Sequence, residues 1–128
     1  MKETTKIEHI NVTVNDPDNT AVMLEKLFGW KVRWSGASID NGYTVHVGDA
    51  DQYLALYRPD NPPEAANKSY SMLNGLNHIA FVVEDLDALE EKVTELGYTP
   101  INHSEYEPGR RFYFRDENNI EFELVSYT

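Results

Sequence analysis

The stretch IEHINVTVND at residues 7–16 returns later in the chain as LNHIAFVVED at residues 76–85. The two stretches align without a gap, so that His78 falls on His9 and Asp85 falls on Asp16. Both are strand-like in their apolar pattern. Self-similarity between two such widely separated stretches indicates that the chain contains two copies of one structural unit.

Both copies continue with the same elements. An amphipathic stretch with an aspartate cap follows at residues 16–28 and 85–96, and it predicts a helix in each copy. Gly29 and Gly97 then stand where a helix end turns left-handed. Three further strand-like runs complete each copy, at residues 31–34, 43–48 and 52–58 and at residues 99–103, 111–116 and 120–127. Each copy is therefore predicted to be a βαβββ module.

The segment between the copies, residues 59–74, carries Pro59, Pro62 and Pro63. These prolines exclude a sheet ladder and a helix interior, so we predict a linker. A copy of roughly 55 residues has too little apolar surface to fold alone, and the two copies must share a structure. We predict one α+β domain over residues 1–128, with module one at 5–58 and module two at 75–128.

Composition limits the possible functions. The chain has 128 residues, no cysteine and a formal net charge of −11. The lack of cysteine excludes disulfides, thiolate metal sites and cysteine nucleophiles. The negative charge opposes nucleic acid or an anionic membrane as partner. Because no apolar run approaches the roughly 20 residues of a membrane span and no signal-peptide core opens the chain, we predict a cytoplasmic protein.

Strand alternation indicates which side chains share a face. His9 and His78 fall on the sheet face turned away from the helix of their module. In the last strand, Phe122 and Leu124 need the core, which turns Glu123 to the face opposite the helix. If the two sheets curve so that these faces meet, His9, His78 and Glu123 converge. Two imidazoles and a carboxylate are a ligand set for a divalent ion of the Fe, Mn, Ni, Co or Zn kind.

The doubled module, with His-Ile in each opening strand and RFYFRDENNIEFEL at residues 111–124, resembles the vicinal oxygen chelate superfamily. That superfamily includes glyoxalase I, extradiol dioxygenases, epimerases, fosfomycin-modifying enzymes and bleomycin-resistance proteins. The resemblance covers nearly the whole chain. It implies two tandem modules that form a U-shaped mixed sheet around a cavity, a homodimer, and His9, His78 and Glu123 as the metal ligands.

The fourth ligand position of this superfamily differs here. When residues 52–58 are laid on residues 120–126, Ala55 falls against Glu123, whereas four-ligand glyoxalase-type members carry glutamate there. Three-ligand extradiol dioxygenases have a tyrosine at the place of Tyr113, but they have Asp-Pro-x-Gly where this chain has Asp-Glu-Asn-Asn at residues 116–119. Asn119 is expected to replace the glycine in a left-handed conformation.

Other residues are expected to shape the cavity. Tyr113 is a candidate catalytic acid or hydrogen-bond donor, and Arg111 a candidate anion-binding residue. Ordinary cross-strand packing and solvated arginines are the alternative interpretation. The predicted substrate-binding residues are Trp34, Tyr53, Tyr57, His103 and Arg111.

Two polar residues are left outside the predicted ligand set. His46, between Val45 and Val47, is expected on the helix side as a structural histidine. Glu121 is expected to be a rim carboxylate or a solvated neighbour of the site, with a possible role in moving a proton.

Two functions follow from this pattern. The first is a metal-dependent enzyme in which the ion binds vicinal oxygens of a small organic substrate, as a lyase, an isomerase or a ring-cleaving dioxygenase, with Tyr113 and Glu123 as catalytic residues. The alternative is a metal-free protein that binds or sequesters a small molecule, of the bleomycin-resistance type. A third possibility is an interaction protein that has kept the fold without the site.

Overall fold

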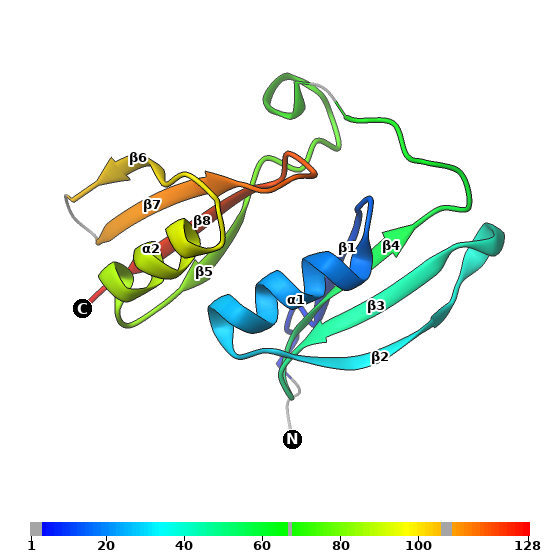
Figure 1. The fold of residues 1–128 in the computed structure, drawn as a ribbon, viewed down its shortest axis with the longest axis horizontal. Coiled ribbons are helices and arrows are strands. Elements are labelled where there is room, and N and C mark those ends of the chain that lie inside the picture. Colours follow the sequence, from blue (N-terminus) through cyan, green and yellow to red (C-terminus); the bar gives the residue numbers. More distant parts are fainter. Residues whose placement is uncertain (1–3, 67, 106–108) are drawn as a thin grey trace. The chain divides into compact units, whose positions relative to one another are not determined.

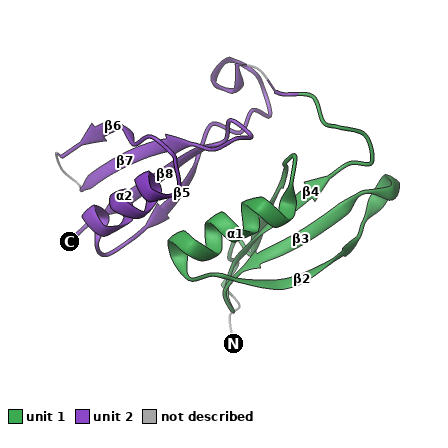
Figure 2. Ribbon diagram, viewed as in Figure 1, with its two compact units in different colours: residues 1–64 green, residues 65–128 purple. Residues whose placement is uncertain are grey.

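The computed structural model describes residues 4–66, 68–105 and 109–128. The chain divides into two compact units, Met1–Glu64 (unit 1) and Ala65–Thr128 (unit 2), shown in Figure 2. Each unit contains one of the two predicted modules.

Unit 1 consists of one helix on a four-stranded sheet (Figure 1). Its elements are β1 (His9–Thr13), α1 (Pro17–Phe28), β2 (Lys31–Ala37), the short 3-10 helix η1 (Ile39–Asn41), β3 (Tyr43–Gly48) and β4 (Tyr53–Arg58). The strand order is β1-β4-β3-β2. The opening strand β1 pairs in parallel with β4, and the other pairs are antiparallel.

Unit 2 repeats this arrangement. It contains the short 3-10 helix η2 (Ser69–Ser71), β5 (Ile79–Val82), α2 (Leu86–Glu95), β6 (Ile101–Ser104), β7 (Arg110–Arg115) and β8 (Glu121–Ser126). The strand order β5-β8-β7-β6 matches that of unit 1, again with a parallel pair at the opening strand. The predicted α+β fold of two tandem βαβββ modules is confirmed.

Both helices begin and end as the sequence predicts. The side chains of Asp16 and Asp85 accept hydrogen bonds from backbone N–H groups in the first turns of α1 and α2. Gly29 and Gly97, after the two helices, have φ angles of 70° and 95°. An L-residue with a side chain is disfavoured in this left-handed region, which explains glycine at both places.

The helix of each unit covers one face of its sheet. In unit 1 the buried side chains include Leu24, Val45, Val47 and Leu56. In unit 2 they include Val93, Phe112, Phe114, Phe122 and Leu124. Because neighbouring residues of a strand point to opposite faces, the residues between these apolar ones lie on the face without a helix. That face carries the predicted site residues except His103.

The predicted linker, residues 59–74, is not purely extended. It contains η2, which places Tyr70 within hydrogen-bonding distance of residues in unit 2. None of the described helices is long and apolar enough to span a membrane.

Candidate metal centre

The sheet of unit 2 brings four of the predicted site residues together: His78, Arg111, Tyr113 and Glu123. Ala80, in β5, pairs with Glu123 of β8, and Glu123 pairs with Tyr113 of β7. His78 lies just before β5, one position before the Ile79–Phe122 pair, and therefore next to Glu121. These neighbours share the sheet face opposite α2, because the residues alternating with them are the buried Phe112, Phe114, Phe122 and Leu124.

The imidazole of His78 lies between two carboxylates. Its Nε2 atom is 3.1 Å from Glu123 Oε1, and its Nδ1 atom is 3.4 Å from Glu121 Oε2. The two glutamate side chains are only 7% and 8% exposed, whereas that of His78 is 35% exposed. The ring is therefore accessible while its carboxylate partners are fixed in the sheet.

Each buried glutamate has its own arginine. Arg111 Nη1 donates to Glu123 Oε2 at 3.0 Å, and Arg115 Nη2 donates to Glu121 Oε1 at 2.8 Å. Buried carboxylates are strongly disfavoured without such partners. The pairing leaves one oxygen of each glutamate directed at His78.

Two tyrosines complete this cluster. Tyr70 of η2 donates to Glu121 Oε2 at 2.8 Å, and its hydroxyl lies 3.2 Å from His78 Nδ1. The hydrogen bond to Glu121 raises the pKa of Tyr70. Tyr113 makes an edge contact with the ring of His78, with centroids 5.6 Å apart. Burial, and then the charge of Glu123, raise the pKa of Tyr113, so its hydroxyl keeps its proton at neutral pH.

The donor atoms of unit 2 suit part of a metal site. Two ligands that each lie about 2.1 Å from an ion at a right angle are about 3 Å apart, and His78 Nε2 and Glu123 Oε1 have this separation. Within residues 4–66, 68–105 and 109–128, however, no three histidine or acidic side chains are grouped so that they alone hold an ion. The third predicted ligand, His9, belongs to unit 1.

The matching face of unit 1 is aromatic. His9 stacks on Tyr53 with ring centroids 4.7 Å apart, and the His9 Nδ1 atom is 2.8 Å from Glu8 Oε1. Arg33 lies over the ring of Tyr53 at 4.4 Å. The register pairs His9 with Tyr53, which stands where unit 2 has Glu121. The structure thus places two predicted site residues, His9 and Tyr53, in direct contact.

The expectation that His46 faces the helix is wrong. Its ring stacks on Tyr53 at 4.6 Å and contacts Trp34 at 5.1 Å, whereas its neighbours Val45 and Val47 are buried in the core. Alternation along β3 places His46 opposite to both valines, which the sequence already contained as a signal. Burial, and then the positive charge of His9, lower the pKa of His46.

Two other predicted positions in unit 1 lie on β4. Ala55 pairs with His46 and Asn11 and is 2% exposed, which confirms alanine at the position equivalent to Glu123. Tyr57 is further along the strand, and its hydroxyl donates to the carbonyl of Ile39 at 3.1 Å. The side chain of Trp34 is partly exposed, so its indole is accessible at the end of the ring stack.

His103 lies apart from the cluster around His78. Its Nε2 atom is 3.1 Å from Glu90 Oε1 of α2, which places it on the helix side of the sheet. The register between β6 and β7 shifts between Ile101 and Ser104, and Asn102 has a φ angle of 53°. This irregularity breaks the simple alternation of β6, so the sequence pattern does not determine which face carries His103.

Glu121 corrects a second expectation. It is neither a rim carboxylate nor solvated, because its side chain is 8% exposed and contacts Arg115, Tyr70 and His78. Strand alternation puts Glu121 on the same face as Glu123, but it does not identify its partners. Tyr70 was missed because nothing in the linker sequence indicated a contact with β8.

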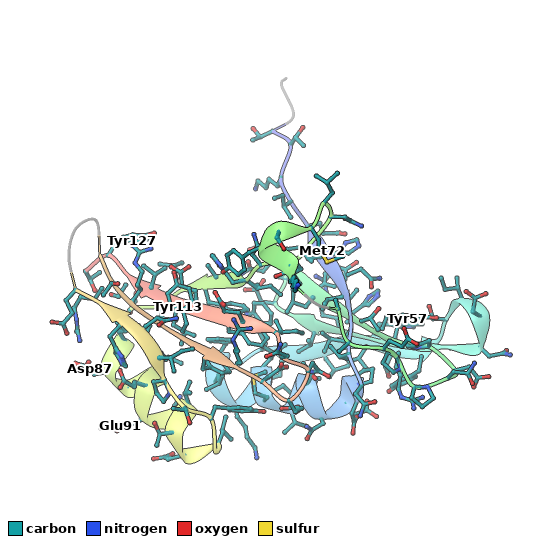
Figure 3. All side chains as sticks on the ribbon, turned by 90° about the horizontal axis from the view of Figure 1, so that it is seen from above. Tyr57, Met72, Asp87, Glu91, Tyr113 and Tyr127 are labelled. Atoms are coloured by element: carbon teal, nitrogen blue, oxygen red, sulfur yellow. The ribbon has the colours of Figure 1, made fainter. Side chains whose placement is uncertain are left out.

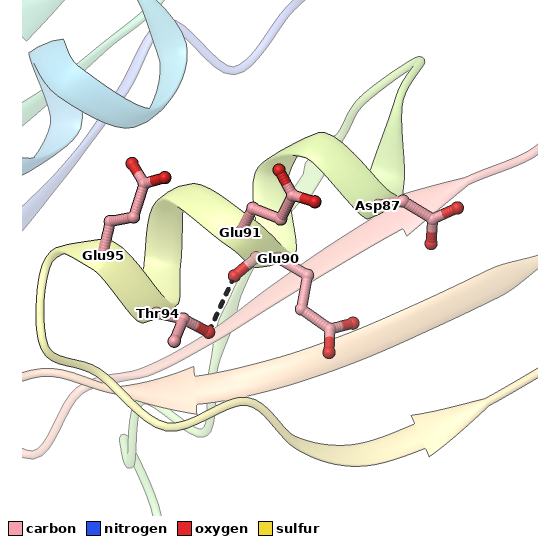
Figure 4. A pocket seen from close by; sticks show the side chains of 5 residues that line it. All are labelled: Asp87, Glu90, Glu91, Thr94 and Glu95. Carbon is pink, nitrogen blue, oxygen red and sulfur yellow. Dashed lines mark hydrogen bonds between the residues drawn. The ribbon is translucent and has the colours of Figure 1, made fainter.

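A hollow on the surface of unit 2 lies elsewhere. It lies along α2, and α2 packs on β7 and β8 from the side opposite His78. Figure 3 shows Tyr113 on one side of this sheet and Asp87 and Glu91 on the other. The hollow is shown in Figure 4, and the residues that line it are Asp87, Glu90, Glu91, Thr94 and Glu95.

Comparison with known proteins gives a family. The profile of the Glyoxalase/Bleomycin resistance protein/Dioxygenase superfamily matches residues 6–124. A comparison with curated proteins gives no match.

Solved structures share the fold. A glyoxylase/bleomycin resistance protein/dioxygenase domain from Frankia sp. EAN1pec is 24% identical, with a TM-score of 0.82 over 98% of this chain and 100% of that chain. The fosfomycin resistance protein FosX from Listeria monocytogenes, in its hexagonal form, is 23% identical, with a TM-score of 0.70 over 98% and 96%. A FosX variant in complex with Mn(II) and 1S,2S-dihydroxypropylphosphonic acid is 22% identical, with a TM-score of 0.72 over 96% and 93%.

Proposed function

The chain belongs to the Glyoxalase/Bleomycin resistance protein/Dioxygenase superfamily, and on this premise we propose that it is a metal-dependent enzyme acting on a small organic substrate. In this proposal His9, His78 and Glu123 bind one divalent ion of the Fe, Mn, Ni, Co or Zn kind. The substrate binds through two vicinal oxygens, in a lyase, isomerase or ring-cleaving dioxygenase reaction. A bound divalent ion polarises such oxygens and stabilises negative charge that develops on them.

The observation that carries the proposal is the 3.1 Å separation between His78 Nε2 and Glu123 Oε1. Glu123 is held by the hydrogen bond from Arg111 to its other oxygen, so the oxygen beside His78 has a fixed direction. Donors that are held in place before an ion arrives bind it more tightly than mobile ones. His9 supports the proposal because it occupies the opening-strand position of its module that His78 occupies in the other.

Two further side chains of unit 2 are assigned roles in the reaction. Tyr113 is protonated at neutral pH, as tyrosine ordinarily is, and burial raises its pKa further, so its hydroxyl can act as a hydrogen-bond donor or acid toward a substrate oxygen. Arg111 has five donors, of which the contact with Glu123 uses one, so it also suits an anionic group of the substrate.

Unit 1 is proposed to supply the wall of the substrate site. Trp34, Tyr53 and Tyr57 present aromatic surface suited to a planar or apolar group. A structure of FosX holds Mn(II) together with a ligand that carries two adjacent hydroxyls, which supports chelation by vicinal oxygens. By the same family analogy we propose a homodimer, and the lack of cysteine fits a cytoplasmic location.

Metal analysis tests the proposal. Tag-free protein is reconstituted separately with Fe(II), Mn(II), Ni(II) and Zn(II), and the bound metal is measured after desalting. The wild type is expected to retain about one ion per chain with at least one of these metals, and Glu123→Gln to lose it. Glu117→Gln, on the adjacent turn, serves as the matched control. A wild type that retains none of the four metals contradicts the proposal.

The second candidate is a metal-free binding protein. The observation that favours it is the row of rings from His9 through Tyr53 and His46 to Trp34, together with alanine at position 55. Such a surface binds planar molecules by stacking without an ion. A thermal-shift screen of aromatic compounds in excess chelator distinguishes the two, since only the binding protein is stabilised under that condition.

A further inference from the structure

Glu121 contacts the nitrogen of His78 that the proposed metal does not use. Its Oε2 atom is 3.4 Å from Nδ1, whereas Glu123 lies at Nε2. The two carboxylates therefore act on opposite nitrogens of one ring. Which nitrogen of a histidine carries the proton is set by the hydrogen bond that the other makes.

The Glu121 carboxylate is fixed on both of its oxygens. Arg115 donates to Oε1 at 2.8 Å, and Tyr70 donates to Oε2 at 2.8 Å. The side chain is buried, so these contacts are little weakened by water. A carboxylate held in this way has a defined position relative to the imidazole.

The groups that face Nδ1 are hydrogen-bond acceptors. The Tyr70 hydroxyl gives its only hydrogen to Glu121, so the oxygen that lies 3.2 Å from Nδ1 is an acceptor. The Glu121 carboxylate is also an acceptor. Both groups that face Nδ1 accept, whereas Nε2 faces one acceptor, Glu123 Oε1 at 3.1 Å, which is the other ligand proposed for the metal. With an ion bound between Nε2 and Glu123, Nδ1 is the nitrogen of the neutral ring that carries the hydrogen.

We propose that Glu121, held by Tyr70 and Arg115, is a positioning residue that binds the Nδ1 proton of His78 and leaves Nε2 as the metal donor. The metal half of this inference rests on the proposed function. Histidine ligands in metal proteins commonly donate their second N–H to a carboxylate, which fixes the tautomer and the ring orientation. Tyr70 extends this support to the linker, outside the sheet.

The first experiment measures the tautomer of His78 without metal. Two-bond ¹H–¹⁵N NMR spectra are recorded on metal-free protein at about pH 9, where an ordinary histidine is neutral, with His78→Gln used for assignment. The neutral wild-type ring is expected to carry its hydrogen on Nδ1 in a measurable fraction of molecules, with the rest on Nε2 facing Glu123. In the isosteric Glu121→Gln variant the Nδ1–H fraction falls, because the amide is a weaker acceptor and Nε2–H then donates to Glu123.

The second experiment measures Mn(II) affinity by titration. Glu121→Gln is expected to weaken binding by about 10- to 100-fold, the usual effect of removing a carboxylate behind a histidine ligand. Tyr70→Phe removes one hydroxyl from an exposed position and is expected to weaken binding by less. Tyr98→Phe is the control, because Tyr98 also donates to a glutamate, Glu117, but not beside His78. Circular dichroism verifies that each variant folds.

The outcomes separate this inference from the proposed function. If the wild type binds Mn(II) and Glu121→Gln changes neither the tautomer nor the affinity, the positioning role is overturned while the proposed function stands. Weaker binding with an unchanged tautomer also overturns the role, because Glu121 then acts only through its charge. If the wild type binds none of the four divalent metals, the proposed function fails, and with it the metal half of the inference.

Discussion

At the scale of single residues, the cluster around His78 depends on two buried carboxylates, each of which is paired with an arginine. Glu123 has almost no contact with solvent, and Arg111 provides the compensating positive charge. Replacing such a pair by apolar residues is often tolerated, but removing one partner leaves a buried charge without compensation. The stability of β7 and β8 is therefore linked to the same residues that are proposed to bind metal and substrate.

Arg111→Met is expected to lower the free energy of unfolding by about 1–3 kcal/mol, because Glu123 loses its partner. Urea denaturation at neutral pH measures the effect. Arg110→Met is the control, since Arg110 pairs with Asp87, whose side chain is 74% exposed. An exposed pair of this kind contributes little to stability, because solvent screens it. Equal losses in the two variants contradict the prediction.

Residue-level prediction from the sequence succeeded on β7, where alternation with the buried Phe112 and Phe114 sets the face of each residue. Alternation along residues 111–115 puts Arg111, Tyr113 and Arg115 on one face, and their contacts with Glu123, His78 and Glu121 agree with it. The prediction failed for His46, where the alternation was applied in the wrong sense. It also failed for Glu121, because its burial depends on contacts with β7 and the linker that no local pattern contains.

At the scale of elements, an equivalent turn in the two modules has a similar hydrogen-bond pattern, but the pKa of its aspartate is shifted in opposite directions. Asp49, between β3 and β4, accepts hydrogen bonds from the backbone N–H groups of Asp51 and Gln52. Asp116, between β7 and β8, accepts from Asn118 and Ile120 in the same way. The hydrogen bond from Asp51 is the main cause that lowers the pKa of Asp49, whereas burial raises the pKa of Asp116.

The two aspartates are therefore expected to affect stability with opposite pH dependence. A raised pKa in the folded state means that the contribution of Asp116 is complete below the ordinary value of about 3.9 and is lost as the pH rises through the folded value. For Asp49 the contribution is present above about 3.9 and is lost as the pH falls through its lowered folded pKa.

Denaturation of Asp116→Asn and Asp49→Asn between about pH 3 and pH 7, on either side of the ordinary aspartate pKa, tests this expectation. The stability of the wild type relative to Asp116→Asn is expected to fall as the pH rises. Relative to Asp49→Asn it is expected to rise. The same sign for both variants is the result that opposes the prediction.

The end of α1 gives a prediction about the backbone. Gly29 has a φ angle of 70°, and a Cβ atom built there meets nothing within 4 Å. Gly29→Ala is thus expected to reduce stability by about 1 kcal/mol through the left-handed backbone alone, with no steric contribution. Gly29→Asn is expected to lose less, because asparagine tolerates this conformation. Thermal unfolding of both variants measures the difference, and an alanine variant as stable as the wild type opposes it.

Asparagine already takes this role elsewhere in the chain. Asn119 has a φ angle of 63° in the turn before β8, as predicted for the position where related motifs have glycine. Asn102 has a φ angle of 53° at the irregularity in β6, which the sequence did not indicate. A turn between two clear strands can be predicted, whereas a bulge inside a short strand depends on its neighbours.

At the scale of the whole molecule, the proposed metal site requires both units. If His9 and His78 bind the same ion, His9→Ala and His78→Ala are each expected to weaken Mn(II) binding by at least about 100-fold, since a lost ligand removes several kcal/mol. His103→Ala is the matched control, because His103 lies on the helix side of its sheet. Full affinity in His9→Ala assigns the ion to unit 2 alone and contradicts the shared site.

The sequence alone determined the two modules, the limits of their helices and the face of each sheet that carries polar residues. These features depend on periodicity, caps and turns, which are properties of residues close together in the chain. Only the tertiary structure decided that His78 lies between Glu121 and Glu123, that Tyr70 supports Glu121, and that His103 contacts α2. Strand register and linker path bring these groups together from distant parts of the chain, and no local pattern records such a distance.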